Sequence, residues 1–403
     1  MSLRWVEGGV CAPLGFRAAG VAAGLKGEGQ LDLCLIVSDR VCSACGCFTA
    51  NRACAAPVLL CKEHLERTKG RAKAIVMNSG NANACTGKKG ELEVRRVVER
   101  VAQLAGCQLD EVLPASTGVI GIPFPGEKIL DALPKAAKEL SRSGAAAAAQ
   151  SIMTTDTKPK SAALEQIGNL RCSLGGIAKG SGMIAPNMAT MLSVITTDVK
   201  ASSSCLQLLL REAVRESFNA VTVDGDTSTN DTVLLLANGM SEGRSLDEAI
   251  ELREEFGAAL TELCINLAKQ IARDGEGASK LVSIEVVNAL TKDEARSVGK
   301  ILANSPLIKT AIYGMDPNWG RFVAALGRTG VPVDPSTVCF YLGGELWLDT
   351  EYQEALSEED ARSRMGGKEC VIRVDLGRGV ARDTVWTCDF TEEYIRINAH
   401  YRT

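Results

Sequence analysis

Aromatic residues and histidine are scarce in this chain of 403 residues. Phe, Trp and Tyr make up 4% of the sequence, so the core must be built mainly from Val, Leu, Ile, Ala and Cys. The two histidines are His64 and His400, and no GxSxG motif occurs, which argues against a Ser-His-Asp enzyme. His64 lies in the charged stretch CKEHLERTKG, which we interpret as a solvated turn.

Long apolar runs and an excess of positive charge are also missing. No run of 18 apolar residues occurs, which argues against a membrane-spanning helix. The net charge is −4, whereas a nucleic-acid-binding protein needs a basic face. The first residues, MSLRWVEGG, lack the basic-then-apolar pattern of a signal peptide. We therefore expect a cytoplasmic protein with no nucleic-acid and no membrane partner.

Cysteine is abundant. The fifteen cysteines are scattered through apparent strands and helices, which is typical of small buried apolar side chains in a reducing compartment. Cys42, Cys45 and Cys47 in VCSACGCF form a cluster that could bind a metal. No matching second pair follows, and zinc sites usually have four ligands. We predict a structural role for this cluster and no metal site.

The apolar pattern indicates alternating helices and strands without regular βαβ units. We therefore predict a mixed α/β (α+β) fold in which helices cover layered sheets, with a linker near 276–281. The segments that carry this prediction are strands at 31–37, 72–78 and 307–314 (LIKTAIYG), an amphipathic helix at 90–106, a second helix near 127–142, a hairpin at 161–180 and a long helix at 245–275.

Six polar segments each follow the end of a strand or helix. Turn chemistry alone accounts for Gly, Asn and Asp in any single loop. Six such loops together predict a polar site assembled from distant parts of the chain. They are NSGNANACTG (78–87), STGVIG (116–121), TTDTKPK (154–160), DGDTSTNDT (224–232), RDGEGASK (273–280) and DPNWGR (316–321).

A further stretch, KGSGMIAPNMATMLSVITTD (179–198), ends in an apolar strand that begins close to Thr190. A threonine hydroxyl becomes a useful nucleophile when its own α-amine takes the proton, which requires the threonine to be an N-terminus. The Ala189–Thr190 bond would then have to be cut by the chain itself. The residues alone leave open that Thr190 simply starts a strand, because β-branched residues favour strands.

Taken together, these motifs resemble the glutamate N-acetyltransferase/ornithine acetyltransferase family of arginine biosynthesis. The stretch 179–198 resembles the family's processing site. NSGNANACTG, STGVIG, IMTTDTKPK, FNAVTVDGDTSTNDT, ARDGEGASK, DPNWGR and RINAHYRT resemble the family's other motifs, in its order. The resemblance covers nearly the whole chain.

The resemblance implies a self-cleaving enzyme with an N-terminal threonine nucleophile. Cleavage between Ala189 and Thr190 would give an α chain, 1–189, and a β chain, 190–403. Within the β chain, 190–280 would complete the main catalytic domain and 281–403 would form a smaller domain. Two chains of each kind would assemble into an α2β2 heterotetramer.

The implied activity is acetyl transfer from N2-acetylornithine to glutamate through an acetyl-threonine intermediate. No permanently bound cofactor is expected, and acetyl-CoA is a possible second donor. An aminopeptidase or amidase with the same nucleophile is the alternative, in which water takes the acyl group.

The resemblance also assigns site residues. Thr117 and Gly118 are expected to form the oxyanion hole. The expected substrate-binding residues are Thr155, Lys179, Thr190, Glu276, Asn398 and Thr403. Lys179 and Glu276 supply the two charge signs that a zwitterionic amino acid requires. Met315 and His400 depart from the usual family residues.

Overall fold

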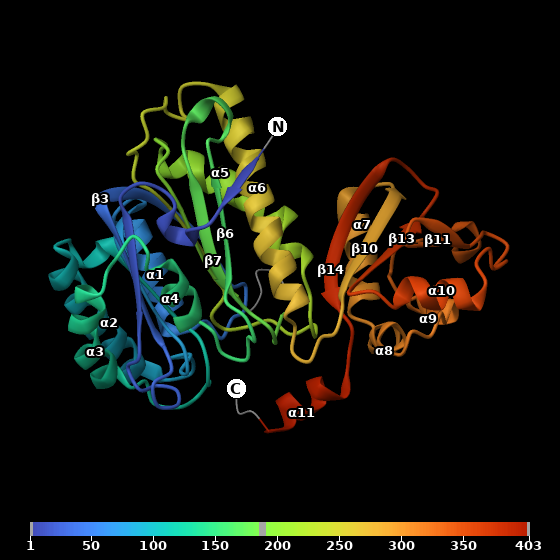
Figure 1. Cartoon of the computed structure of the whole chain (residues 1–403), viewed down its shortest axis with the longest axis horizontal. Helices are drawn as coiled ribbons and strands as arrows, with labels where there is room; N and C mark the ends of the chain where they lie inside the picture. The colour runs from blue at the N-terminus through green and yellow to red at the C-terminus, as the bar shows by residue number, and fades with distance from the viewer. Residues whose placement is uncertain (1–2, 185–190, 401–403) are drawn as a thin grey trace.

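The chain has two bodies that stand side by side (Figure 1). The computed structural model describes residues 3–184 and 191–400, and all structural statements concern these residues. The first body contains a nine-stranded sheet with strand order β1-β6-β7-β8-β9-β3-β4-β5, and β2 pairs with β3 outside this path. The second body contains a five-stranded sheet with strand order β12-β11-β13-β10-β14.

The elements of the first body alternate along the chain. Its strands are β1 (Arg4–Val6), β2 (Phe16–Val21), β3 (Leu33–Phe48), β4 (Arg71–Asn78), β5 (Val112–Ser116), β6 (Lys160–Glu165), β7 (Leu174–Lys179), β8 (Leu192–Thr197) and β9 (Thr232–Ala237). Its helices are α1 (Ala56–Arg67), α2 (Gly87–Ala105), α3 (Gly126–Lys138), α4 (Ala145–Ser151), α5 (Ser203–Glu216) and α6 (Ile250–Arg273).

The second body follows α6 in the chain. Its strands are β10 (Leu281–Ala289), β11 (Cys339–Leu342), β12 (Glu345–Leu348), β13 (Glu369–Asp375) and β14 (Ala381–Cys388). Its helices are α7 (Lys292–Ala303), α8 (Pro306–Gly314), α9 (Trp319–Leu326) and α10 (Glu358–Met365). The last helix, α11 (Glu392–His400), leaves the second body and lies below the junction of the two bodies (Figure 1).

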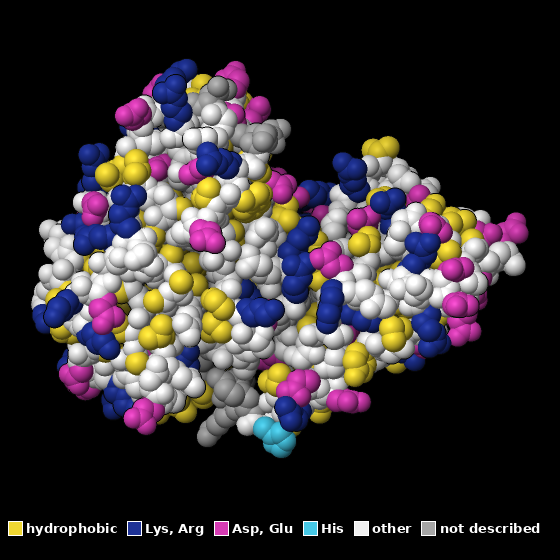
Figure 2. Space-filling view, viewed as in Figure 1, with side chains coloured by type: hydrophobic (Ala, Val, Ile, Leu, Met, Phe, Trp, Pro, Cys, Tyr) yellow, Lys and Arg dark blue, Asp and Glu magenta, His cyan; other side chains and the backbone are white. Residues whose placement is uncertain are grey.

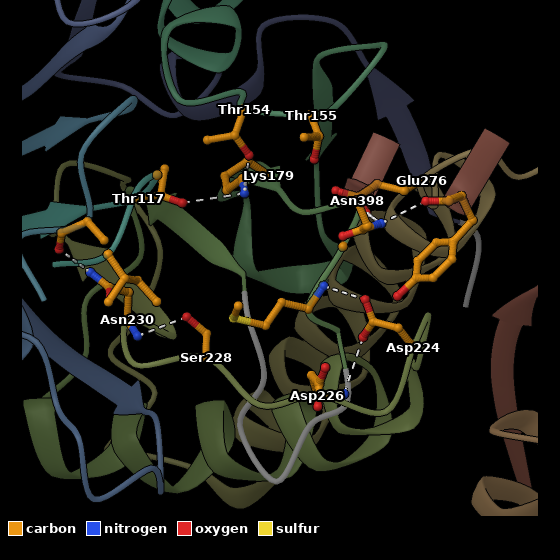
Figure 3. Close-up of a pocket in the computed structure, with 16 residues that line it drawn as sticks. Thr117, Thr154, Thr155, Lys179, Asp224, Asp226, Ser228, Asn230, Glu276 and Asn398 are labelled. Carbon is orange, nitrogen blue, oxygen red and sulfur yellow. Dashed lines mark hydrogen bonds between the residues drawn. The ribbon is translucent and has the colours of Figure 1, made fainter. Parts of the chain in front are cut away.

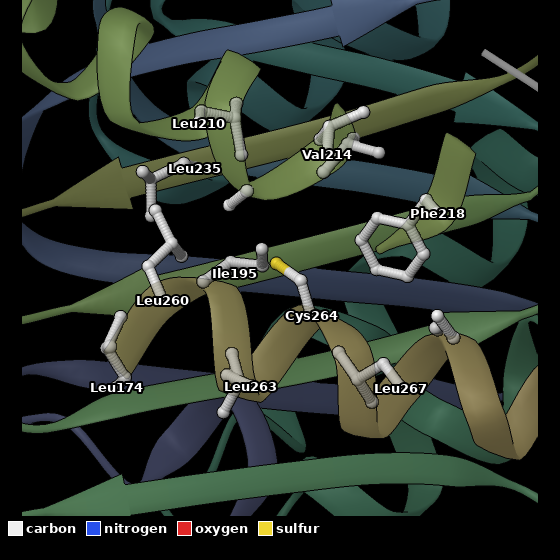
Figure 4. Close-up of a cluster of buried hydrophobic side chains, with 14 of the residues drawn as sticks. Leu174, Ile195, Leu210, Val214, Phe218, Leu235, Leu260, Leu263, Cys264 and Leu267 are labelled. Carbon is white, nitrogen blue, oxygen red and sulfur yellow. The ribbon is translucent and has the colours of Figure 1, made fainter. Parts of the chain in front are cut away.

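Helices α5 and α6 pack on one face of the first sheet. Helix α6 buries Phe256, Leu260, Leu263, Leu267 and Ile271, a spacing of three or four residues that lines one side of a helix. These side chains belong to one apolar cluster with residues of α5 and of the sheet. Figure 4 shows Leu260, Leu263 and Leu267 of this cluster. Complete burial of each large aliphatic side chain contributes about 1.5–3 kcal/mol, so this contact is a major source of stability.

The long strand β3 connects two parts of the first sheet. Residues 33–37 pair with both β2 and β4, and residues 43–48 pair with β9. The register with β4 shifts between Val37 and Cys42. One strand therefore links the half of the sheet that carries β4 and β5 to the half that carries β8 and β9.

The predicted fold class is confirmed: the fold is mixed α/β, with layered sheets covered by helices. The predicted hairpin is present as β6 and β7. Among the described residues, no helix is long and apolar enough to cross a membrane. On the face drawn in Figure 2, Lys and Arg side chains are interspersed with Asp and Glu. The division into chains 1–189 and 190–403, and of the latter at 280/281, stays a prediction.

Two local predictions were wrong. The segment 307–314 is a helix, α8, because Pro306 occupies its first turn and Ile308, Ala311 and Ile312 are buried at helical spacing. His64 is not in a solvated turn. It is buried inside α1, and its Nδ1 lies 2.8 Å from the carbonyl oxygen of Val112. Burial lowers the pKa of His64.

The predicted structural role of the cysteine cluster agrees with its position in β3. Cys45 and Cys47 face the core under α5 and α6, whereas Cys42 faces the core on the opposite side of the sheet. Side chains of a strand alternate between faces, so the three sulfur atoms cannot surround one ion. Among residues 3–184 and 191–400, no group of three or more His, Cys, Asp or Glu side chains could hold a metal ion.

We predict that changing Cys42, Cys45 and Cys47 together to Ala preserves activity and lowers the free energy of unfolding by roughly 1 kcal/mol per residue. The reason is that each thiol only fills space in the core. Chemical denaturation and an activity assay would check this, with Cys85→Ala, at an exposed position, as the control. Loss of activity together with a stoichiometric metal would contradict it.

Candidate active site

A pocket of about 220 Å³ opens where the ends of several elements of the first body meet α11 (Figure 3). Its polar lining comes from the segments after β5, after α4, at the end of β7, before β9 and after α6, and from α11 itself. The lining residues are Ala82, Thr117, Gly118, Ile120, Thr154, Thr155, Lys179, Gly182, Met183, Asp224, Asp226, Ser228, Asn230, Glu276, Tyr394 and Asn398.

Six of the residues predicted from the sequence line this pocket. They are Thr117, Gly118, Thr155, Lys179, Glu276 and Asn398. The predicted cleavage residues, Ala189 and Thr190, and the predicted binding residue Thr403 lie outside the described residues. The fold brings these six side chains into one pocket, although Thr117 and Asn398 are 281 positions apart in the sequence. The roles of the six residues stay predictions.

Lys179 is the buried cation of the pocket. Its Nζ donates to Thr154 Oγ1 at 2.8 Å and to Thr117 Oγ1 at 3.4 Å, and it lies 3.9 Å from Asp156 Oδ2. The side chain is almost fully buried. Burial lowers the pKa of Lys179, and the nearby carboxylate of Asp156 partly opposes that effect. The carboxylate of Asp156 therefore helps to keep the Lys179 amine protonated.

Asp156 connects Lys179 to a second buried lysine. Its Oδ1 accepts from Lys160 Nζ at 2.6 Å and from the Gly180 N–H at 2.7 Å. Lys160 Nζ also donates to Asp274 Oδ2 at 2.6 Å. Burial alone would raise the pKa of Asp156, but the ammonium groups of Lys179 and Lys160 outweigh it and hold the pKa below its ordinary value. Asp156 is thus a positioning residue for Lys179.

Thr117 and Gly118 form the wall of the pocket beside Lys179. Gly118 has φ = +128°, and a Cβ there would lie 2.4 Å from the backbone carbon of Gly80 and 2.5 Å from the Asn81 nitrogen. Only glycine fits this close approach. Asn230 fastens the same wall, because its Nδ2 donates to Ala82 O at 2.7 Å and Ser116 O at 2.8 Å.

Glu276 and Asn398 close the pocket on the side of α11. Asn398 Nδ2 donates to Glu276 Oε2 at 2.7 Å, and the Glu276 N–H donates to Ser181 O at 2.8 Å. A Cβ at Gly182 would lie 2.3 Å from the Glu276 carboxyl carbon, so glycine makes room for this carboxylate. Tyr394 stacks on Phe390 with ring centroids 4.6 Å apart, which packs the base of α11.

The carboxylates of the pocket lie opposite Lys179. Asp224 and Asp226 lie beside each other in Figure 3, below Glu276. Burial raises the pKa of Asp224, and hydrogen bonds from backbone N–H groups partly oppose this rise. One side of the pocket therefore suits a carboxylate, and the other suits an ammonium group.

Sequence reasoning missed several polar residues of this site. Asp156, Asp224, Asp226, Ser228 and Asn230 were not named individually, although all lie in the predicted polar loops. The signal was available in part, since TTDTKPK and DGDTSTNDT place carboxylates directly beside strand ends. Which carboxylate faces a lysine depends on how β6, β7 and β9 are arranged, and periodicity does not specify this.

One of the six predicted loops does not belong to the pocket. DPNWGR leads into α9 in the second body. Met315, the departure beside it, has φ = +52° at the end of α8 and does not line the pocket. His400 does lie near the site: it borders a shallow hollow that shares Thr154 and Thr155 with the pocket.

Comparison with known proteins places this chain in a family. The model of the ArgJ family matches residues 17–403. The chain belongs to the ArgJ family. The resemblance predicted from the sequence is therefore confirmed, as is the activity class, an acetyltransferase of arginine biosynthesis. The alternative, an aminopeptidase or amidase, is not favoured.

Two relatives match the chain over nearly its full length. The arginine biosynthesis bifunctional protein ArgJ of Thermosynechococcus vestitus is 47% identical, covering 99% of both chains. The protein of that name from Symbiobacterium thermophilum is 44% identical, covering 100% of both. The crystal structure of ArgJ from Bacillus halodurans is 42% identical, with a TM-score of 0.49, covering 51% of this chain and 97% of that chain.

We predict that Gly118→Ala destabilises the protein more than Gly121→Ala. Both glycines have positive φ, but a Cβ at Gly121 meets nothing within 4 Å, whereas a Cβ at Gly118 meets backbone. The difference in the free energy of unfolding should be about 1–3 kcal/mol, the usual effect of overpacking. Urea denaturation of the two variants measures it, and equal losses would contradict the close approach.

Proposed function

We propose that this protein transfers the acetyl group of N2-acetylornithine to glutamate through an acetyl ester on Thr190. The observation that carries the proposal is the meeting of Thr117, Gly118, Thr155, Lys179, Glu276 and Asn398 in one pocket of an ArgJ-family chain. Buried groups of both charge signs suit an α-amino acid.

The proposed maturation step creates the nucleophile. Thr190 Oγ attacks the carbonyl carbon of Ala189, an ester forms, and the carbon–nitrogen bond breaks as the nitrogen takes a proton. Water then hydrolyses the ester, which leaves a carboxylate on Ala189 and a free α-amine on Thr190. This amine has an ordinary pKa of about 7.7–8.0, so it can accept a proton near neutral pH.

The proposed transfer uses that amine as the base. The amine takes the hydroxyl proton while Thr190 Oγ attacks the acetyl carbonyl of N2-acetylornithine. Thr117 and Gly118 donate to the oxyanion that develops, and ornithine leaves with the proton. The amine of glutamate then attacks the carbonyl carbon of the acetyl ester. Thr190 Oγ leaves and takes back a proton, and N-acetylglutamate is released. Loss of one oxyanion donor costs roughly 10²–10³ in rate in other acyl-transfer enzymes.

The charged side chains orient the substrate in this proposal. Lys179, held by Asp156, binds a carboxylate, and Glu276, held by Asn398, binds an ammonium group. Thr155 adds a hydroxyl that already bonds Ser181 Oγ at 2.7 Å. The predicted contribution of Thr403 belongs to the same proposal. All catalytic groups come from the chain, so the scheme needs no resident cofactor.

Several finer features belong to the same proposal. We infer that acetyl-CoA serves as a second acetyl donor, which accords with the word "bifunctional" in the names of the relatives. We also infer a cytoplasmic α2β2 heterotetramer of chains 1–189 and 190–403. The fifteen free thiols, mostly buried, support a reducing compartment.

Mass spectrometry of wild type and Thr190→Ala tests the nucleophile. We predict that the wild type splits at 189/190, whereas Thr190→Ala remains one chain of 42.7 kDa without activity, because it lacks the attacking hydroxyl. Thr190→Ser, which keeps a hydroxyl, should still split. In the wild type, label from N2-[¹⁴C]acetylornithine should appear on glutamate faster than as free acetate. Acetyl-CoA, supplied instead of N2-acetylornithine, should also give N-acetylglutamate. An intact and fully active Thr190→Ala variant would refute the proposal.

The titration of Lys179 gives a second prediction. Burial lowers its pKa below the ordinary 10.5, so its positive charge, and with it affinity for a carboxylate, should be lost as the pH rises through that lowered value. The product N-acetylglutamate carries no free amine, so it reports on carboxylate binding. Its inhibition constant should therefore increase as the pH rises, and this increase should occur before pH 10.5 is reached.

Lys179→Met should weaken that inhibition roughly 10–100-fold near neutral pH and remove this pH dependence, since a hydrogen bond to a charged group is worth about 1.5–3 kcal/mol. Lys158→Met is the control and should behave like the wild type, because Lys158 is exposed in the polar loop 154–160 and does not line the pocket. Unchanged inhibition of Lys179→Met would show that this lysine does not bind the carboxylate.

A further inference from the structure

The loop at residues 222–232 contacts both chain segments that flank residues 185–190. We call this loop the bracing loop. On the upstream side, Asp224 Oδ2 accepts from the Met183 N–H at 2.5 Å and Asp224 Oδ1 accepts from the Ile184 N–H at 2.8 Å. The Ile184 carbonyl accepts from the Val223 N–H at 2.6 Å and from Thr222 Oγ1 at 3.0 Å. Ile184 is therefore held through both of its backbone polar groups.

The downstream side is held by the other end of the same loop. Asp231 Oδ1 accepts from the Met191 N–H at 2.9 Å, and the Thr232 N–H donates to the Met191 carbonyl at 3.0 Å. From there β8 pairs in parallel with β9, beginning with Leu192 opposite Thr232. Met191 is thus also held through both of its backbone polar groups.

The bracing loop is itself fixed to the first body. Thr49 Oγ1 donates to Ser228 O at 2.7 Å, and Asn230 Nδ2 bonds Ala82 and Ser116. Asp231 is buried, and burial raises its pKa. Hydrogen bonds in such a water-poor setting are strong, so the loop holds the two segments at a set separation.

The sequence places the predicted scissile bond, 189–190, between these two held points. Attack of a hydroxyl on a neighbouring carbonyl is fast only when the atoms meet within about 3–3.5 Å and in line. Fixing both ends of a short segment removes most of the conformations that would miss this geometry. A segment held at one end only would adopt the reactive geometry less often.

We propose that Asp224 and Asp231 are positioning residues for self-cleavage, which hold the chain on either side of the bond that Thr190 attacks. This inference rests on the proposed self-cleavage. The two aspartates act through backbone N–H groups and not by contact with substrate.

A time course of cleavage tests the inference. The full chain is made by cell-free synthesis and followed by mass spectrometry, for the wild type and for Asp224→Ala and Asp231→Ala. Each variant should cleave roughly 10–100-fold more slowly, the effect of a misplacement of about 1 Å. Hydroxylamine, which cleaves esters, should not restore the rate, because the ester would not form.

Asp198→Ala is the matched control. Asp198 is also a buried aspartate that accepts two backbone N–H groups, from Leu14 at 3.0 Å and Ser173 at 2.8 Å, but it follows the far end of β8. It should lose a similar amount of thermal stability and cleave at the wild-type rate. Asp231→Asn should cleave nearly as fast as wild type, because its amide oxygen can still accept from Met191. The second oxygen of Asp231 has no hydrogen-bond partner among the described residues.

The outcomes separate this inference from the proposed function. A wild type that remains intact would refute self-cleavage itself. If the wild type splits and both Asp224→Ala and Asp231→Ala split as fast as the wild type, the positioning role alone is overturned. The same holds if they split no more slowly than Asp198→Ala. Rescue by hydroxylamine would also overturn it, since the defect would then follow the attack. A slow Asp231→Asn would overturn it for Asp231, because hydrogen bonding would not be the decisive property.

Discussion

The pocket depends on one buried charge, the ammonium group of Lys179. Removing such a charge from water is costly, and the cost is offset only when carboxylates and hydrogen-bond acceptors surround it. Asp156 provides the carboxylate, and Thr117 and Thr154 provide hydroxyl acceptors. Asp156 in turn is shared with Lys160, which pairs with Asp274 beyond the end of α6. The need to neutralise one lysine therefore ties together β6, β7, the loop after α4 and the end of α6.

The same arrangement explains why loops distant in sequence meet. The parallel pairs β4–β5 and β8–β9 bring strand ends to common edges, and β3 holds those two pairs in one sheet. Asn230 then bonds across from the β8–β9 side to the β4–β5 side. These two hydrogen bonds fix the pocket wall before any ligand arrives.

Much of this could be predicted from the sequence, but not its geometry. The mixed α/β fold followed from apolar periodicity, and Thr117, Lys179 and Glu276 followed from the motifs that carry the family resemblance. Periodicity failed at 307–314, where a short apolar run fits strand and helix alike and the proline before it decided for a helix. The solvated turn predicted around His64 from the charged stretch was wrong because the charged neighbours of His64 lie on the outer side of α1. DPNWGR has the composition of a site loop, yet its position in the second body could be known only from the topology.

The strand order has a consequence for a cleaved chain. If the bond 189–190 is cut, β8 and β9 belong to one chain, while β7 on one side and β3 on the other belong to its partner. The new chain would supply the middle of a sheet whose two flanks come from the other chain. The pieces would then be held by hydrogen bonds on both edges of the inserted pair, and neither could leave without opening the sheet. Once unfolded, such a protein would have to reassemble from two molecules, so its recovery would depend on concentration in a way that the uncut chain's folding does not.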